Sequence, residues 1–167
     1  MRECVVKVNG QTRRETIKDN VLLLDFLRDN LEVRSVKAAC WRGECGLCTV
    51  LLNGHLVKSC LVLAVEANGG EVTTVEGLVQ DGKLSRIQNA FVEHGGTQCG
   101  FCTPAFVLTT HELLEHNPKP SAGELDEAVS GLICRCGTYS QIKEAVAAVS
   151  QPDGKIEPLQ KLGKSVR

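Results

Sequence analysis

Eight of the nine cysteines in this chain of 167 residues fall into two sets whose spacing suits metal chemistry. The first set has three cysteines within nine residues and a fourth after a further eleven: Cys40, Cys45, Cys48 and Cys60. The second set consists of two short pairs about thirty residues apart: Cys99 with Cys102, and Cys134 with Cys136. Thiolates bind zinc and iron well. The odd number of cysteines argues against a framework in which every cysteine forms a disulfide.

The spacing of the first set, C-x4-C-x2-C with a later fourth cysteine, is typical of plant-type 2Fe-2S sites. In such a site one loop wraps around the cluster, and Gly43 and Gly46 stand where a side chain would obstruct that wrap. Amides turned inward would hydrogen-bond the sulfurs. A structural zinc site is the alternative, although zinc sites usually take their ligands as two short pairs. A Rieske site needs two histidines, and none lies beside these cysteines.

The second set is ambiguous from its spacing alone. Two short pairs brought together by helices suit zinc, an iron–sulfur cluster or a redox disulfide. A cluster elsewhere in the same chain favours a second cluster here, because two clusters would give electrons a path through the protein. Positions at helix N-termini also favour the thiolate form that a metal requires. The remaining cysteine, Cys4, lies in an alternating stretch and is interpreted as a small core residue.

The elements that must position these cysteines differ between the two halves of the chain. In the first half, Asn9-Gly10 and Asn53-Gly54 are hairpin signals that predict a small sheet. The expected strands are 4–8, 11–17, 48–52, 56–62 and 71–75, with a helix over 21–30. Beyond Glu76 the apolar period becomes helical and predicts helices over 84–94, 104–116, 122–132 and 139–149. A capping box, Ser121 with Glu124, supports the start of the third of these helices.

Composition and charge exclude several classes of protein. The formal net charge is −1 and no stripe of Lys and Arg is visible, so nucleic acid is not an expected partner. No apolar run approaches the roughly 20 residues that a membrane-spanning helix needs. The first residues lead directly into an alternating stretch rather than into the apolar core of a signal peptide. We therefore expect a cytoplasmic protein with no membrane contact.

Three segments resemble the small iron–sulfur subunit of molybdenum hydroxylases, the xanthine oxidase family. They are GECGLCTV at 43–50, QCGFCTP at 98–104, and Cys134-Arg135-Cys136 followed by Tyr139. The resemblance covers nearly the whole chain and implies an α+β fold. It implies a plant-ferredoxin-like β-grasp domain over residues 1–78 and an all-α four-helix-bundle domain over 79–150, each with one 2Fe-2S cluster. From residue 151 onward Pro, Gly and Lys dominate, so we expect residues 151–167 to form a C-terminal surface arm.

The resemblance also implies a role. Such a subunit relays electrons between the molybdopterin of a large subunit and the FAD of a medium subunit, in an expected dimer of heterotrimers. Gln98 would hydrogen-bond the pterin, and Cys136 would lie against the pterin's amino group while binding iron. The chain itself is expected to carry no catalytic residue and no substrate site. A purine or other N-heterocycle is the expected substrate of the complex, with carbon monoxide, aldehyde and hydroxybenzoyl-CoA enzymes as alternatives.

Two other classes of function compete with this interpretation. A free-standing ferredoxin-like carrier would leave the helical half unexplained, and a zinc module for protein interaction would be colourless. The chain also departs from the family pattern just after Cys136, where Gly137-Thr138 replaces the usual Thr-Gly. This change leaves all eight expected ligands in place. It alters the turn, and with it the hydrogen bonds around the second cluster and the potential of that cluster.

Overall fold

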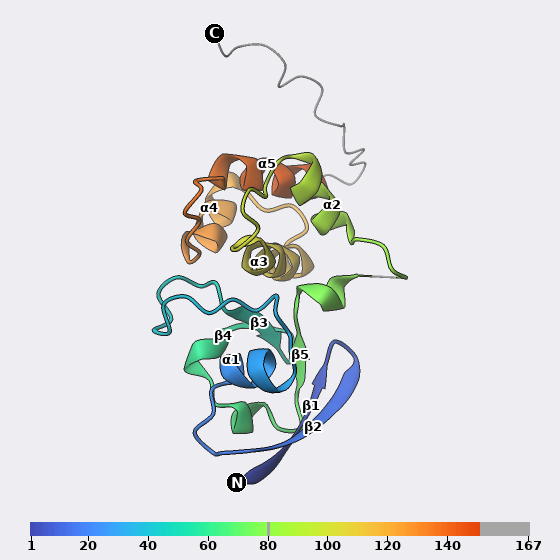
Figure 1. Ribbon diagram of the computed structural model, residues 1–167. Coiled ribbons are helices and arrows are strands. Elements are labelled where there is room, and N and C mark those ends of the chain that lie inside the picture. Colours follow the sequence, from blue (N-terminus) through green and yellow to red (C-terminus); the bar gives the residue numbers. More distant parts are fainter. Residues whose placement is uncertain (80, 151–167) are drawn as a thin grey trace.

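The computed structural model describes residues 1–79 and 81–150 and shows an α+β fold, a mixed sheet followed by helices (Figure 1). The strands are β1 Arg2–Val8, β2 Gln11–Ile17, β3 Thr49–Leu52, β4 His55–Lys58 and β5 Glu71–Thr73. They lie in the order β2-β1-β5-β3-β4. β1 and β5 run parallel, while the other neighbours are antiparallel. The surface arm expected at 151–167 lies outside the described residues.

The two Asn-Gly hairpins are confirmed. Asn9 and Gly10 have φ of 49° and 81°, and Asn53 and Gly54 have φ of 51° and 84°. Left-handed geometry at both central positions is typical of the type I′ turn, whose twist matches that of the flanking strands. The turns join β1 to β2 and β3 to β4 in antiparallel pairs. Local turn chemistry therefore sets the register of four of the five strands.

The helix expected over 21–30 is present but irregular. A single α-helical turn, α1 Leu23–Asp25, widens into a π-helical turn, η1 Phe26–Asn30. The Leu31 amide donates to the Phe26 carbonyl at 3.1 Å, five residues back. The apolar side chains of this segment are fully buried: Leu23, Leu24, Phe26 and Leu27. Packing of this apolar stripe against the sheet forms the core of the first half.

The strand predicted over 56–62 is wrong in its second half. β4 ends at Lys58, and a 3-10 turn follows, η2 Ser59–Leu61. The Ser59 hydroxyl is fully buried and donates to the Cys48 carbonyl at 2.7 Å, and the Ser59 amide donates to the same carbonyl at 3.3 Å. The same turn brings Cys60 beside Cys48. Residues 59–62 therefore do not continue the strand, and Cys60 lies in a turn beside Cys48 instead.

The second half contains the four expected helices. They are α2 Arg86–Glu93, α3 Thr103–His116, α4 Ala122–Ser130 and α5 Tyr139–Val149, and two further 3-10 turns, η3 Ala64–Ala67 and η4 Val75–Leu78, precede them. The capping box at the start of α4 is confirmed, since the Ser121 amide donates to Glu124 at 2.7 Å and the Glu124 amide donates to Ser121 at 3.3 Å. None of the helices in residues 1–79 and 81–150 is long and apolar enough to cross a membrane.

The buried side chains form two clusters. One lies between the sheet and α1, and the other lies among the four helices. The helical cluster also contains Cys45, Leu47 and Leu51 from the first half. α3 passes beside β3, so the cysteine loop of the first half packs directly against the helices (Figure 1).

Candidate metal centres

The first cysteine loop leaves η1 and returns to the sheet at β3. Its backbone turns at Gly43 and Gly46, where φ is +74° and +71°. This wrap points the amides of Arg42 and Cys45 at the Cys40 sulfur, each at 3.4 Å. Those two N–H groups, with Cys45 first, lower the pKa of Cys40 to about 6. The loop therefore favours an anionic sulfur at this position.

The other two cysteines of the first set, Cys48 and Cys60, are each 3% exposed. Burial, and next the adjacent Cys48 thiol, raise the pKa of Cys60 to about 11. Negative charge on Cys40 also raises the pKa of Cys60. The structure thus brings all four predicted residues of the first set into one site.

The second set lies at the junctions of α3 and α5. Cys102 is the N-cap residue of α3, and Cys134 lies in the segment between α4 and α5. Burial, and next the Cys134 thiol, raise the pKa of Cys102 to about 12. Cys99 and Cys136 are exposed. The backbone N–H of Phe101, and next the Cys136 thiol, lower the pKa of Cys99.

Each set divides into two pairs of neighbouring thiols. The pairs are Cys40 with Cys45 and Cys48 with Cys60 in the first set, and Cys99 with Cys136 and Cys102 with Cys134 in the second. Within the two described stretches, no three His, Cys, Asp or Glu side chains converge on a point that could hold one metal ion. A zinc site needs four donors around one ion, whereas a 2Fe-2S cluster takes two ligands on each of two irons. The pairing of the thiols matches the two-by-two ligand arrangement of a 2Fe-2S cluster.

Polar groups surround Cys134 in a way that spacing alone did not reveal. The Thr138 hydroxyl lies 3.1 Å from the Cys134 sulfur, and both groups are buried. Burial raises the pKa of Cys134, but hydrogen bonds from the Thr138 hydroxyl and amide outweigh it and leave the pKa lowered to about 7. The Tyr139 hydroxyl accepts from the Cys134 amide at 2.9 Å and donates to the Leu132 carbonyl at 2.8 Å. Tyr139 is thus a packing residue with a hydrogen-bonded hydroxyl, and its ring contacts that of Phe106.

The two cysteine sites are joined by backbone. The Ile133 amide donates to the Cys45 carbonyl at 3.0 Å, and Ile133 directly precedes Cys134. A Cβ on Gly46 would lie 2.3 Å from the Gly131 carbonyl oxygen. Gly46 is therefore required for close contact with the helical half as well as for its left-handed backbone. The sequence singled out this glycine but for a different reason, which was the wrap around a metal.

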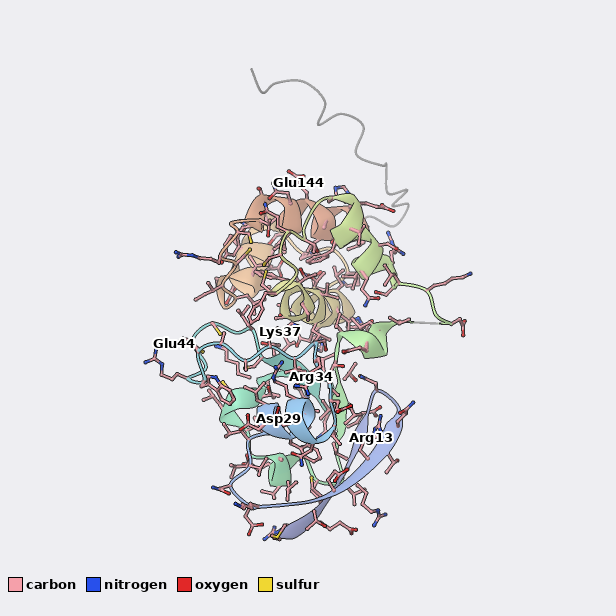
Figure 2. All side chains as sticks on the ribbon, in the orientation of Figure 1. Arg13, Asp29, Arg34, Lys37, Glu44 and Glu144 are labelled. Atoms are coloured by element: carbon pink, nitrogen blue, oxygen red, sulfur yellow. The ribbon has the colours of Figure 1, made fainter. Side chains whose placement is uncertain are left out.

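The second site faces the surface. Gln98, Cys99 and Cys136 are exposed, and so are the neighbouring apolar side chains of Phe101 and Ile133, at 43% and 52%. Lys37 lies where the two halves meet, just below α3 (Figure 2). Its ammonium group is 5.8 Å from the centroid of the Phe101 ring, within range of a cation–π contact. An exposed metal site with an apolar border is suited to exchange electrons with a partner.

Comparison with known proteins agrees with this geometry. Residues 6–74 match the model of the 2Fe-2S iron-sulfur cluster binding domain, and residues 74–147 match that of the [2Fe-2S] binding domain. The nicotinate dehydrogenase small FeS subunit of Eubacterium barkeri is 44% identical over 141 residues, which is 84% of this chain and 90% of that protein. This chain belongs to the small iron–sulfur subunits of molybdenum hydroxylases. Such a subunit transfers electrons within an oxidoreductase of the xanthine dehydrogenase family.

Solved structures extend the match to the fold. The crystal structure of quinoline 2-oxidoreductase from Pseudomonas putida 86 superposes with a TM-score of 0.86 at 38% identity, covering 89% of this small iron–sulfur subunit and 92% of the matched chain. The aldehyde oxidoreductase of Desulfovibrio desulfuricans ATCC 27774 superposes with a TM-score of 0.85, also at 38% identity. That match covers 90% of this subunit but 17% of the longer chain. Small iron–sulfur subunits of this family belong to multi-subunit enzymes or correspond to one part of a larger polypeptide.

Proposed function

We propose that this small iron–sulfur subunit relays electrons between a molybdopterin centre and FAD, both carried by partner subunits. The proposal assigns one 2Fe-2S cluster to each set of thiols: Cys40, Cys45, Cys48 and Cys60, and Cys99, Cys102, Cys134 and Cys136. When bound, each cluster supplies a one-electron carrier. The chain supplies the ligands, the hydrogen bonds to their sulfurs and the fixed position of each site.

The observation that carries the proposal is the backbone contact between the two sites. An electron relay needs its two centres close together and at a constant separation. The hydrogen bond from the Ile133 amide to the Cys45 carbonyl joins a residue of the first set to the neighbour of Cys134 in the second. The absence of a side chain at Gly46 lets the same two loops approach closely. A free-standing carrier with one site would have no use for this contact.

The protonation of the sulfurs also supports metal binding. A cysteine must lose its proton before it binds iron. The pKa of Cys40 is lowered to about 6 and that of Cys134 to about 7, so each set contains a sulfur that is readily deprotonated near neutral pH. The raised pKa values of Cys60 and Cys102 arise from burial and from neighbouring thiols. Bound iron would compensate both effects by supplying positive charge.

The exposed face of the second site is the proposed contact with the molybdopterin-binding large subunit. There Gln98 would hydrogen-bond the pterin, and Cys136 would bind iron while lying against the pterin's amino group. A medium FAD-binding subunit would receive electrons at the first site, in a dimer of heterotrimers. We assign residues 1–78 to a ferredoxin-like β-grasp domain and residues 79–150 to a four-helix-bundle domain. The two matched family models, which meet at residue 74, support this division.

An aromatic N-heterocycle is the proposed substrate of the complex. Two similar proteins carry such compounds in their names, nicotinate in one and quinoline in the other. Aldehyde is the second candidate, since one similar structure is an aldehyde oxidoreductase. The substrate site itself would lie on the large subunit.

The first test is purification of the native complex, with iron and zinc content and low-temperature EPR after dithionite reduction. We expect about four irons per chain and two distinguishable 2Fe-2S signals. Cys45→Ser should remove one signal and Cys99→Ser the other, while Cys4→Ala serves as the control that leaves both. Stoichiometric zinc, or a single signal in the unaltered protein, would contradict the relay. Turnover of nicotinate, quinoline and an aromatic aldehyde would then separate the two substrate classes.

A further inference from the structure

The turn after Cys136 is built around a glycine that is needed for its backbone conformation. Gly137 has φ +76°, and its amide donates to the Cys134 carbonyl at 3.3 Å. A Cβ at this position would meet no atom within 4 Å, so space does not require glycine here. The left-handed conformation does, because it brings the Cβ of an L residue too close to the following carbonyl oxygen. With glycine at 137, the threonine falls one position later.

Thr138 therefore occupies the N-cap position of α5 with its side chain turned inward. Threonine at an N-cap ordinarily accepts a hydrogen bond from a helix amide, but this hydroxyl makes no such bond. Thr138 is instead 2% exposed, and its hydroxyl lies 3.1 Å from the Cys134 sulfur. A metal-bound thiolate carries no proton and can only accept. In the cluster-bound protein the hydroxyl must therefore be the donor.

We propose that Thr138 is a positioning residue that raises the reduction potential of the second 2Fe-2S cluster by hydrogen-bonding the Cys134 thiolate. The inference rests on the proposed function, since it requires that Cys134 binds the cluster. Reduction adds negative charge to the cluster and its sulfurs, so a donor stabilises the reduced state more than the oxidised state. The burial of both groups strengthens the effect, because water does not compete for the sulfur.

Cys134 differs from Cys40 of the first site in having a side-chain donor. Cys40 receives its hydrogen bonds from the backbone amides of Arg42 and Cys45, which no side-chain substitution removes. The Thr138 hydroxyl beside Cys134 therefore changes the reduction potential of the second cluster without changing that of the first. Thr138 thereby changes the difference in potential between the two clusters, which is the driving force for electron transfer between them.

The test compares Thr138→Val with Thr138→Ser in the assembled complex. Valine keeps the shape of threonine without the hydroxyl, and serine keeps the hydroxyl. Midpoint potentials of both clusters come from redox titration followed by EPR. For Thr138→Val we expect the reduced-to-oxidised ratio of the second cluster to fall about tenfold at a given potential, a shift of about 59 mV. The first cluster and the Thr138→Ser complex should keep the wild-type potentials.

Thr110→Val is the matched control. Thr110 is also a threonine with 2% exposure in the helical half, but it lies within α3. An unchanged second midpoint in Thr138→Val would overturn the proposal, and so would an equal shift in Thr110→Val. If Thr138→Val does not load iron, Thr138→Ala against Thr138→Ser gives the same comparison with two smaller side chains. Absence of a second 2Fe-2S signal in the unaltered complex would instead refute the proposed function itself.

Discussion

Replacement of Gly46 by alanine tests the contact between the two halves. The added Cβ would lie 2.3 Å from the Gly131 carbonyl oxygen and 2.5 Å from Leu132 Cδ2. The carbonyl oxygen belongs to the backbone and cannot rotate away as a side chain could. One of the two loops must therefore move, which strains or breaks the adjacent hydrogen bond from the Ile133 amide to the Cys45 carbonyl.

The magnitude follows from two contributions. The left-handed backbone at Gly46, with φ +71°, costs any L residue roughly 1–2 kcal/mol. Overpacking of the contact adds roughly 1–3 kcal/mol. Gly54→Ala provides the control, because Gly54 has φ +84° and a Cβ there meets nothing within 4 Å. The two variants share the backbone penalty, so their difference isolates the contact between the halves.

The assay is thermal unfolding of the iron-loaded protein, followed by circular dichroism at a fixed scan rate. In a chain of this size each kcal/mol lowers Tm by roughly 2–4 °C, so Gly46→Ala should unfold roughly 2–12 °C below Gly54→Ala. We also expect Gly46→Ala to impair electron transfer between the clusters, whereas Gly54→Ala leaves it unchanged. Equal Tm values for the two variants would refute the close approach of Gly46 to Gly131.

Three further substitutions probe individual groups. Tyr139→Phe leaves the Cys134 amide and the Leu132 carbonyl without their partner and should destabilise the protein by about 1–3 kcal/mol, measured by denaturant unfolding. Cys4→Ala should leave the iron content unchanged, because Cys4 is fully buried in the first-half core and bonds to the Ala64 carbonyl. The Ser121 amide, and next its hydroxyl, lower the pKa of Glu124 below its ordinary 4.5. The carboxylate therefore stabilises the fold above pH 4.5, and this contribution is lost as pH falls through the folded-state pKa. A Tm series from neutral to acid pH should show the Tm difference between wild type and Glu124→Gln shrinking below pH 4.5.

Local sequence chemistry predicted the parts of the fold that depend on a few adjacent residues. Asn-Gly at 9–10 and 53–54 specifies turns with left-handed φ, so the hairpins could be placed without tertiary information. The capping box of Ser121 similarly marks the start of α4. The spacing of the cysteines predicted the two sets that the structure brings together. Their roles as ligands, and the pterin contacts of Gln98 and Cys136, stay predictions.

Features that depend on distant residues could not be predicted in this way. The strand after His55 ends at Lys58, where the buried Ser59 hydroxyl bonds to the Cys48 carbonyl, eleven residues away. The π-helical turn at 26–30 places an apolar stripe on the sheet, and helical periodicity alone does not distinguish it from an α-helix. The contact of Gly46 with Gly131 joins segments far apart in the chain. The reversed Gly-Thr order was visible in the sequence, but the bond from Thr138 to Cys134 required coordinates.

The contact between Gly46 and Gly131 also limits how such subunits can be recombined. A chimera that joins the first half of this chain to the helical half of a relative would need a matching approach between these two loops. A donor helical half with a bulkier or displaced loop before Cys134 would meet Gly46 at a distance where not even a methyl group fits. Two halves that each bind a cluster can still fail to pack against each other. A chimera should therefore take the Gly46 loop and the Gly131 loop from the same parent.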